Sequence, residues 1–207
     1  GSLSYAVSAA SAQFQHLPYK RKMAVAFERN HRGYIPINTS TAVNSKRAEV
    51  TKPNQSTSFM MMREDAFETE AYLSCPNQWP ALDGFREAVT AYNDALTSLG
   101  HRLMQVAAHS LGAPPDTFAA AFEQPTTWLR LLHYPPAPAQ RADDLYGSAP
   151  HTDFGCLTIL AQDDAGGLQV QTPDGDWIDV PPRPGAFIVN VGDMLHRWSN
   201  GRLLSTP

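Results

Sequence analysis

The sequence predicts an α+β fold in which helices come first and a set of short antiparallel strands follows. In residues 82–111, apolar side chains recur three and four positions apart, which is typical of a long helix with one apolar face. From residue 126 onward, short apolar or alternating runs are separated by Gly, Pro and Asp-Gly turns. Strands of this length and spacing indicate an antiparallel sandwich, a jelly roll or a barrel. With 207 residues and 43% apolar content, the chain is long enough for one globular domain with its own core.

The first part of the chain, residues 3–31, has the apolar spacing of helices, with a break at Pro18 and a second short helix from residue 20 to 28. Residues 32–81 show little periodicity and contain many Gly, Pro and Asn residues, so they predict loops and short strands. The apolar patch at residues 59–62 is interpreted as core packing, because methionine adapts to irregular gaps; a pocket wall is the alternative.

The long helix is expected to end at Gly112, because the following Pro114 and Pro115 cannot continue it. Its apolar stripe predicts packing against a broad surface such as a sheet. The chain therefore divides into a mainly helical region, 1–125, and a β region, 126–207. The expected strands of the second region are residues 128–134, 156–160, 167–171, 177–180 and 186–191.

Composition excludes several classes of protein. The net charge of −4 and the pI near 5.9 argue against a nucleic-acid partner. The sequence has no run of about 18 apolar residues and no basic stretch followed by an apolar segment at its start, so neither a membrane span nor a signal peptide is expected. Only two cysteines occur, which fits a reducing compartment. These features together predict a cytoplasmic protein.

The triplet His151-Thr152-Asp153 is the strongest candidate for a chemical site. On an extended backbone, residues i and i+2 point to the same side, so this spacing aims an imidazole and a carboxylate at one point. Such a pair and a more distant histidine form the facial triad that binds iron(II) and leaves positions open for substrate and oxygen. The alternative is a turn in which Asp153 caps the backbone and His151 is solvated.

The sequence around this triplet resembles the iron-site segment of the isopenicillin N synthase-like oxygenases, which are iron(II)- and 2-oxoglutarate-dependent dioxygenases, and suggests a bacterial member. The resemblance covers most of the chain and is specific from residue 128 onward, with its centre at His151-Thr-Asp-Phe-Gly. Weaker similarity reaches back to His31-Arg-Gly-Tyr34. The stretches that carry it most clearly are residues 129–136, 151–170, 177–182, 184–193 and 198–202.

The resemblance implies a double-stranded β-helix, a distorted jelly roll of eight strands, braced by the N-terminal helices with the metal at one mouth. It implies Fe(II), 2-oxoglutarate and O2 as cofactors, with ascorbate as a supporting reductant. The activity it implies is oxidation of a C–H bond of a small molecule, coupled to formation of succinate and carbon dioxide. By the same resemblance His151 and Asp153 bind the iron, and Tyr134 orients the 2-oxoglutarate.

The strand before the iron loop departs from the family pattern at Leu132, where many members carry an asparagine that contacts the cosubstrate. Strand alternation places Arg130, Leu132 and Tyr134 on one face. If Tyr134 points into the barrel, Arg130 does so too, and a buried guanidinium needs a partner. That partner is either an anionic ligand or an internal Asp or Glu, and the sequence leaves both open.

A second departure concerns the distal histidine ligand, which the family pattern places directly after the position of Pro207. The strand and helix usual before the position of Gly1 are also missing. These departures predict a single oxygenase domain, 1–207, that is truncated at both ends and whose C-terminal strands are incomplete. His196 is the only histidine after Asp153. It precedes the strand that normally carries the ligand, so we expect it not to bind metal. A place in the pocket wall is one alternative role, and a rearranged His196 that binds metal in the truncated chain is another.

Two other functions stay open at this point. The first is a related iron oxidase that takes its electrons from the substrate and does not use 2-oxoglutarate, which the replacement at Leu132 makes conceivable. The second is a non-catalytic, truncated scaffold that acts as a binding module, because two protein ligands hold iron(II) less tightly than three. The sequence does not identify the substrate, the outcome of the reaction or the oligomeric state.

Overall fold

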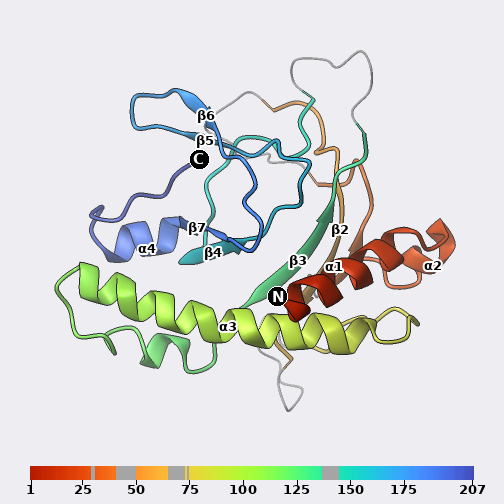
Figure 1. Ribbon diagram of the computed structural model, residues 1–207, viewed down its shortest axis with the longest axis horizontal. Coiled ribbons are helices and arrows are strands. Elements are labelled where there is room, and N and C mark those ends of the chain that lie inside the picture. Colours follow the sequence, from red (N-terminus) through yellow and green to blue (C-terminus); the bar gives the residue numbers. More distant parts are fainter. Residues whose placement is uncertain (29–30, 41–49, 65–72, 74, 137–144) are drawn as a thin grey trace. The chain divides into compact units, whose positions relative to one another are not determined.

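The computed structural model describes residues 1–28, 31–40, 50–64, 73, 75–136 and 145–207, and the chain divides into two compact units. Unit 1 comprises residues 1–44, 49–98 and 119–149, and unit 2 comprises residues 45–48, 99–118 and 150–207. The long helix α3 (Phe85–Ser110) contributes residues to both units. Figure 1 colours the chain by residue number and labels its helices and the strands β2 to β7.

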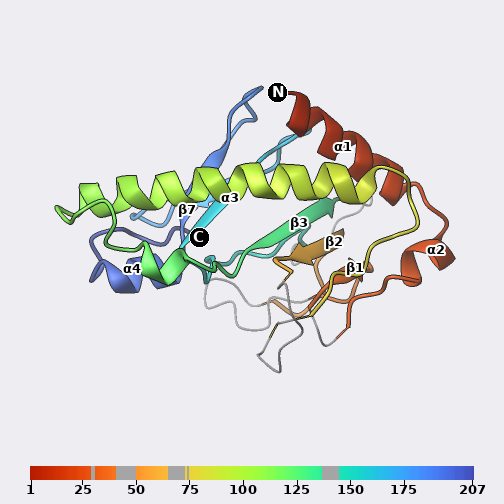
Figure 2. The same cartoon turned by 90° about the horizontal axis from the view of Figure 1, so that it is seen from below.

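Unit 1 contains an antiparallel sheet with the strand order β1-β2-β3 (Figure 2). Phe59 of β2 is the register partner of Tyr34 in β1 and of Leu131 in β3. The elements of this unit, besides the first half of α3, are α1 (Ser2–Gln15), α2 (Tyr19–Met23), β1 (Gly33–Ile35), β2 (Thr57–Met62), a 3-10 turn (Ala120–Phe122) and β3 (Trp128–His133).

An aromatic cluster joins one face of this sheet to the helices. The Phe14 ring of α1 lies 5.8 Å from that of Tyr34, 5.3 Å from that of Phe59 and 5.4 Å from that of Phe85 at the start of α3. Phe14 and Phe59 are fully buried, and Phe85 is 1% exposed. Aromatic pairs at these separations contribute about 0.5–1.5 kcal/mol beyond the burial of their area. This cluster is the core of unit 1.

The opposite face of β3 is open. Because side chains alternate along a strand, Trp128, Arg130 and Leu132 share the face that points away from the aromatic cluster. All three are exposed, Trp128 by 43% and Leu132 by 39%, whereas Leu129 and Leu131 between them are half-buried. Strand β3 thus turns one face toward the core and presents apolar side chains and a guanidinium on the other.

Unit 2 contains the second half of α3, two antiparallel strand pairs and a short helix. In the first pair, β4 (Leu157–Leu160) is joined to β7 (Ile188–Val191). In the second, β5 (Gln169–Gln171) forms a hairpin with β6 (Trp177–Asp179), whose turn contains Gly175 at a φ of 96°, which glycine adopts without strain. The helix α4 (Asp193–Trp198) follows β7 directly.

The strands expected after residue 126 are confirmed as β3 to β7, within two residues at each end. The long helix is confirmed, but it begins at Phe85 rather than residue 82, because Gly84 before it has a φ of 72°. The second helix was expected to reach residue 28 but ends at Met23. The backbone of Phe27 hydrogen-bonds to Tyr34 of β1, so this segment pairs with the sheet instead. The six-residue α4 was not predicted, since it is too short for a periodic pattern.

The apolar patch at residues 59–62 forms most of β2, and its interpretation as core is confirmed: Phe59, Met61 and Met62 are at most 4% exposed. In the part of the chain that the structure describes, neither Cys75 nor Cys156 forms a disulfide. Among the described residues, no helix has the length and apolar character needed to cross a membrane.

Replacement of Phe14 by alanine tests whether the aromatic cluster holds unit 1 together. Phe14→Ala removes a fully buried ring, so the free energy of unfolding should fall by about 3–5 kcal/mol. Tyr5→Ala on the same helix is the matched control, because Tyr5 is 79% exposed and its loss should change stability by no more than about 0.5 kcal/mol. Urea unfolding followed by circular dichroism measures both, and equal effects of the two substitutions would contradict the assignment of the core.

Candidate functional site

His151 and Asp153 lie close together in unit 2, in the irregular segment that leads into β4. The Nε2 atom of His151 is 3.5 Å from Oδ1 of Asp153, as the spacing of the two residues predicts. The His151 side chain is half-exposed and that of Asp153 is 25% exposed. An imidazole and a carboxylate are therefore presented together, and both are accessible.

Two strand residues support the Asp153 carboxylate. A hydrogen bond with His151 is the largest effect and lowers the pKa of Asp153, partial burial opposes it, and hydrogen bonds with Thr158 and Asn190 lower it further. Thr158 in β4 and Asn190 in β7 are register partners, so their side chains share one face of the strand pair. The net lowering keeps the carboxylate ionised at neutral pH, in the state that binds a cation.

The donor chemistry fits iron(II) at two positions, because a neutral imidazole and an ionised carboxylate are ligands of the non-haem iron triad. Within the residues that the structure describes, no group of three His, Cys, Asp or Glu side chains could hold a metal ion. His196 lies in α4, where its Nδ1 atom is 2.9 Å from the carbonyl oxygen of Leu203. It lines a shallow depression with Asp193, Arg197, Asn200 and Gly201.

Arg130 and Tyr134 lie together in unit 1, at the exposed face of β3 and just after it. Arg130 donates a hydrogen bond from Nε to the hydroxyl oxygen of Ser58, a fully buried residue of β2. No Asp or Glu pairs with Arg130 among the described residues, and no further hydrogen bond is formed by its terminal nitrogens there. The internal acid considered as its partner is therefore not found in this part of the chain, and the terminal nitrogens are available to an anion.

Tyr134 carries a protonated phenol beside this guanidinium. Partial burial raises its pKa above the ordinary value, and the positive charge of Arg130 offsets only part of that rise. A Cβ atom at Gly147 would lie 3.0 Å from the ring of Tyr134, so glycine lets the loop at residue 147 pack closely on the ring. Tyr134 can donate a hydrogen bond at neutral pH.

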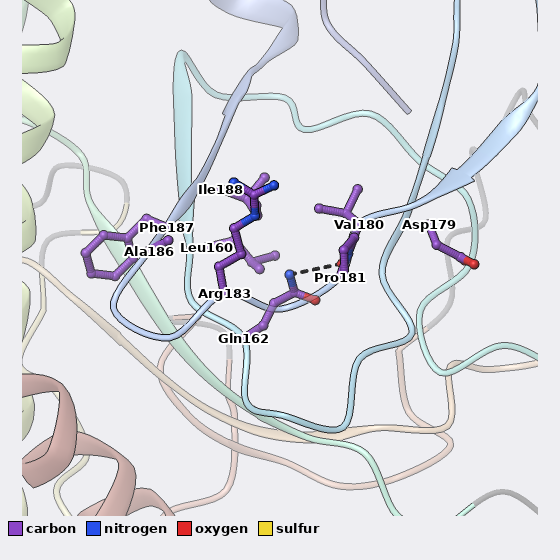
Figure 3. Close-up of a pocket in the computed structure, with 9 residues that line it drawn as sticks. All are labelled: Leu160, Gln162, Asp179, Val180, Pro181, Arg183, Ala186, Phe187 and Ile188. Atoms are coloured by element: carbon purple, nitrogen blue, oxygen red, sulfur yellow. Dashed lines mark hydrogen bonds between the residues drawn. The ribbon is translucent and has the colours of Figure 1, made fainter.

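Unit 2 also contains a cavity of about 350 Å³ at the Leu160–Ile188 end of the β4–β7 pair (Figure 3). Leu160 and Ile188, which are register partners, form part of its apolar wall. Polar groups on its border are Gln162, Asp179 and Arg183, and the amide of Gln162 donates to the carbonyl oxygen of Val180 over 3.3 Å. The sequence did not indicate this cavity.

Thr158 and Asn190 are the site residues that sequence reasoning missed. Both lie in predicted strands, and Asn190 is a polar residue in an apolar run, which is a signal that could have drawn attention to it. Its contact with Asp153 depends on the pairing of β4 with β7, about 30 residues apart in the chain, which the sequence does not specify.

The part of the chain that carries the His151–Asp153 pair matches a known protein family. Residues 125–207 match the family model of the 2OG-Fe(II) oxygenase superfamily. A 2-oxoglutarate-dependent dioxygenase of Didymella fabae is 36% identical over 211 residues, an alignment that covers 97% of this chain and 64% of the relative. The chain thus spans a little under two thirds of the length of this relative.

Solved structures agree with the family match. A full-length Neurospora crassa protein in complex with alpha-KG superposes with a TM-score of 0.85 at 31% identity, covering 99% of this chain and 64% of that one. A second structure of the same Neurospora protein also contains thymine. JOX2 in complex with 2OG, Fe and JA superposes with a TM-score of 0.81 at 31% identity, covering 99% of this chain and 58% of that one.

Acid unfolding tests the environment of Asp153 in the metal-free chain. Because the folded-state pKa is lowered below the unfolded value of about 3.9, the ionised carboxylate stabilises the fold above that pH. This stabilisation is lost as the pH falls through the lower, folded-state pKa. In Asp153→Asn, the stability should therefore fall less steeply as the pH is lowered. Urea unfolding midpoints between about pH 2.5 and 6 measure this dependence. An Asp153→Asn variant whose slope equals that of the unaltered chain would contradict this environment.

Proposed function

We propose that the chain, whose residues 125–207 match the 2OG-Fe(II) oxygenase superfamily, acts in a non-haem iron(II)- and 2-oxoglutarate-dependent oxygenase that oxidises a C–H bond of a small molecule. The observation that carries the proposal is the His151–Asp153 pair, an imidazole 3.5 Å from a carboxylate whose pKa is lowered. The identity with 2-oxoglutarate-dependent relatives supports the same cosubstrate here.

In this proposal, His151 and Asp153 hold the iron. When bound, the metal supplies the redox chemistry that couples O2 to conversion of 2-oxoglutarate into succinate and carbon dioxide and to oxidation of the substrate. The residues of this chain bind the metal and orient the groups that hold it. His151 offers a ring nitrogen, and Thr158 and Asn190 keep the Asp153 carboxylate ionised and directed.

Arg130 and Tyr134 bind a carboxylate of the cosubstrate or of an anionic substrate. The terminal nitrogens of a guanidinium match a carboxylate with two parallel hydrogen bonds, and Arg130 is anchored for this role by Ser58. Tyr134 adds a neutral donor because its pKa is raised. The exposed rings and aliphatic groups around Arg130, among them Trp128 and Leu132, are suited to the apolar part of a ligand.

Finer assignments belong to the same proposal. The motif that begins at His151-Thr-Asp-Phe-Gly supports the isopenicillin N synthase-like branch, a single oxygenase domain over residues 1–207 and its double-stranded β-helix. A small-molecule substrate is supported by the thymine and JA complexes of similar proteins. Bacterial origin and a cytoplasmic location stay predictions from the sequence.

Iron binding tests the metal site directly. Isothermal titration with Fe(II) under anaerobic conditions should show saturable binding by the unaltered chain. His151→Ala or Asp153→Ala should weaken it by more than the ~10–100-fold typical of substitutions outside the ligand sphere. His196→Ala is the matched control and should keep the affinity, because its ring is engaged with the Leu203 carbonyl. Binding that survives loss of His151 and disappears with loss of His196 would overturn the ligand assignment.

Cosubstrate binding tests the role of Arg130. Loss of a charge-assisted hydrogen bond costs about 1.5–3 kcal/mol, so Arg130→Ala should raise the Michaelis constant for 2-oxoglutarate or for an anionic substrate about tenfold or more. Arg130→Lys should recover part of this loss, since it restores the charge without the paired donors. Succinate release is the measurement. Unchanged constants for both ligands in Arg130→Ala would contradict the role, and substrate oxidation without succinate would point to an oxidase that does not use 2-oxoglutarate.

A further inference from the structure

The start of helix α4 in unit 2 is bonded to the backbone that carries the His151–Asp153 pair. The amide of Gly192 donates to the carbonyl oxygen of Cys156 over 2.9 Å, that of Asp193 to Asp153 over 2.7 Å and that of Met194 to Gly155 over 3.1 Å. The first amides of a helix have no partners within the helix and need acceptors elsewhere. Gly192, the N-cap residue of α4, has no side chain to supply one, and the three loop carbonyls take that place.

The absence of a side chain at Gly192 is also what allows the two backbones to approach. A Cβ atom built at Gly192 would lie 2.2 Å from the carbonyl oxygen of Gly155 and 2.9 Å from that of Asp153. Both contacts are with backbone atoms, so no flexible side chain can move aside. The φ and ψ of Gly192 are −94° and 174°, an extended conformation open to any residue. Alanine is therefore excluded by contact with the loop and not by backbone strain.

A side-chain hydrogen bond continues the same attachment between the two ligand candidates. The hydroxyl of Thr152 donates to Oδ2 of Asp193 over 3.1 Å. Thr152 thus bonds to the start of α4, while its neighbours His151 and Asp153 meet each other at 3.5 Å. Asp193 lies in the first turn of α4, where a negative charge is favoured by the helix dipole.

We infer that Gly192, Asp193 and Thr152 are positioning residues that hold the loop 151–156 against the start of α4 and so set the convergence of His151 and Asp153 on a metal ion. This inference rests on the proposed function, because it assigns these residues a role toward the same iron site. The residues touch the loop and do not bind the ion.

The test compares Fe(II) affinity, measured anaerobically by isothermal titration, among matched variants of the full chain. Gly192→Ala should weaken binding by about tenfold or more, as is typical of residues that orient metal ligands. Thr152→Val, which keeps the shape and removes the hydroxyl, should also weaken it, whereas Thr152→Ser should restore the affinity of the unaltered chain. Gly100→Ala in α3, where an added Cβ meets nothing within 4 Å, is the control for a glycine substitution.

Two further readouts separate positioning from loss of structure. The visible absorption of bound Co(II) reports coordination geometry and should change in Gly192→Ala and Thr152→Val but not in Thr152→Ser. Hydrogen exchange of the Asp193 amide, without metal, should accelerate in the same two variants while the rest of the chain keeps its protection. The Thr152 side chain is half-exposed, so we expect Thr152→Val to fold. This variant therefore tests the positioning role by itself if Gly192→Ala does not fold.

The outcomes distinguish this inference from the proposed function. If His151→Ala abolishes Fe(II) binding and both Gly192→Ala and Thr152→Val bind like the unaltered chain with the same Co(II) spectrum, the positioning role is overturned and the iron site stands. If His151→Ala has no effect, or the unaltered chain binds no Fe(II), the iron site is overturned and the positioning role with it. Weakened binding in Thr152→Val with recovery in Thr152→Ser supports both.

Discussion

The backbone amides at the start of a helix need acceptors outside it, and in unit 2 this requirement ties the candidate metal loop to α4. The amides of residues 192–194 bond to carbonyl oxygens of residues 153–156. These three hydrogen bonds fix the backbone path of the loop 151–156 in the absence of any ligand. The side chains of His151 and Asp153 then point where the loop backbone directs them, and the glycine at position 192 is a condition of that contact.

Unit 1 meets a different constraint, which is that a small sheet must bury one face to be stable. The face that carries Phe59 packs on Phe14 and Phe85, and the other face of β3 carries Arg130. Strand alternation links the two roles: if Leu129 and Leu131 turn toward the core, Arg130 must turn away from it. Ser58, on the same face of the sheet as Arg130, is buried and gives the guanidinium a fixed anchor.

The sequence predicted those features that depend on neighbours in the chain. The long helix follows from its apolar period, the strands after residue 126 from their length and turns, and the meeting of His151 with Asp153 from their separation by two residues. It did not predict what depends on pairing between distant segments. The contact of Asn190 with Asp153 requires the β4–β7 register, and the sheet that holds Arg130 requires β2 to pair with a strand about 70 residues later.

The protonation states found in the two units match the two kinds of ligand that the proposed reaction brings. Asp153 is held ionised beside an imidazole in unit 2, which is the state that a divalent cation selects. Arg130 is permanently charged and Tyr134 is held protonated in unit 1, and a guanidinium with a neutral hydroxyl selects a carboxylate. The opposite protonation states would weaken binding of both ligands. A protonated Asp153 would not hold iron, and a Tyr134 phenolate would repel an anion. Taken separately, unit 2 thus presents donors suited to a divalent cation and unit 1 donors suited to a carboxylate, and these are the two kinds of ligand that the proposed reaction uses.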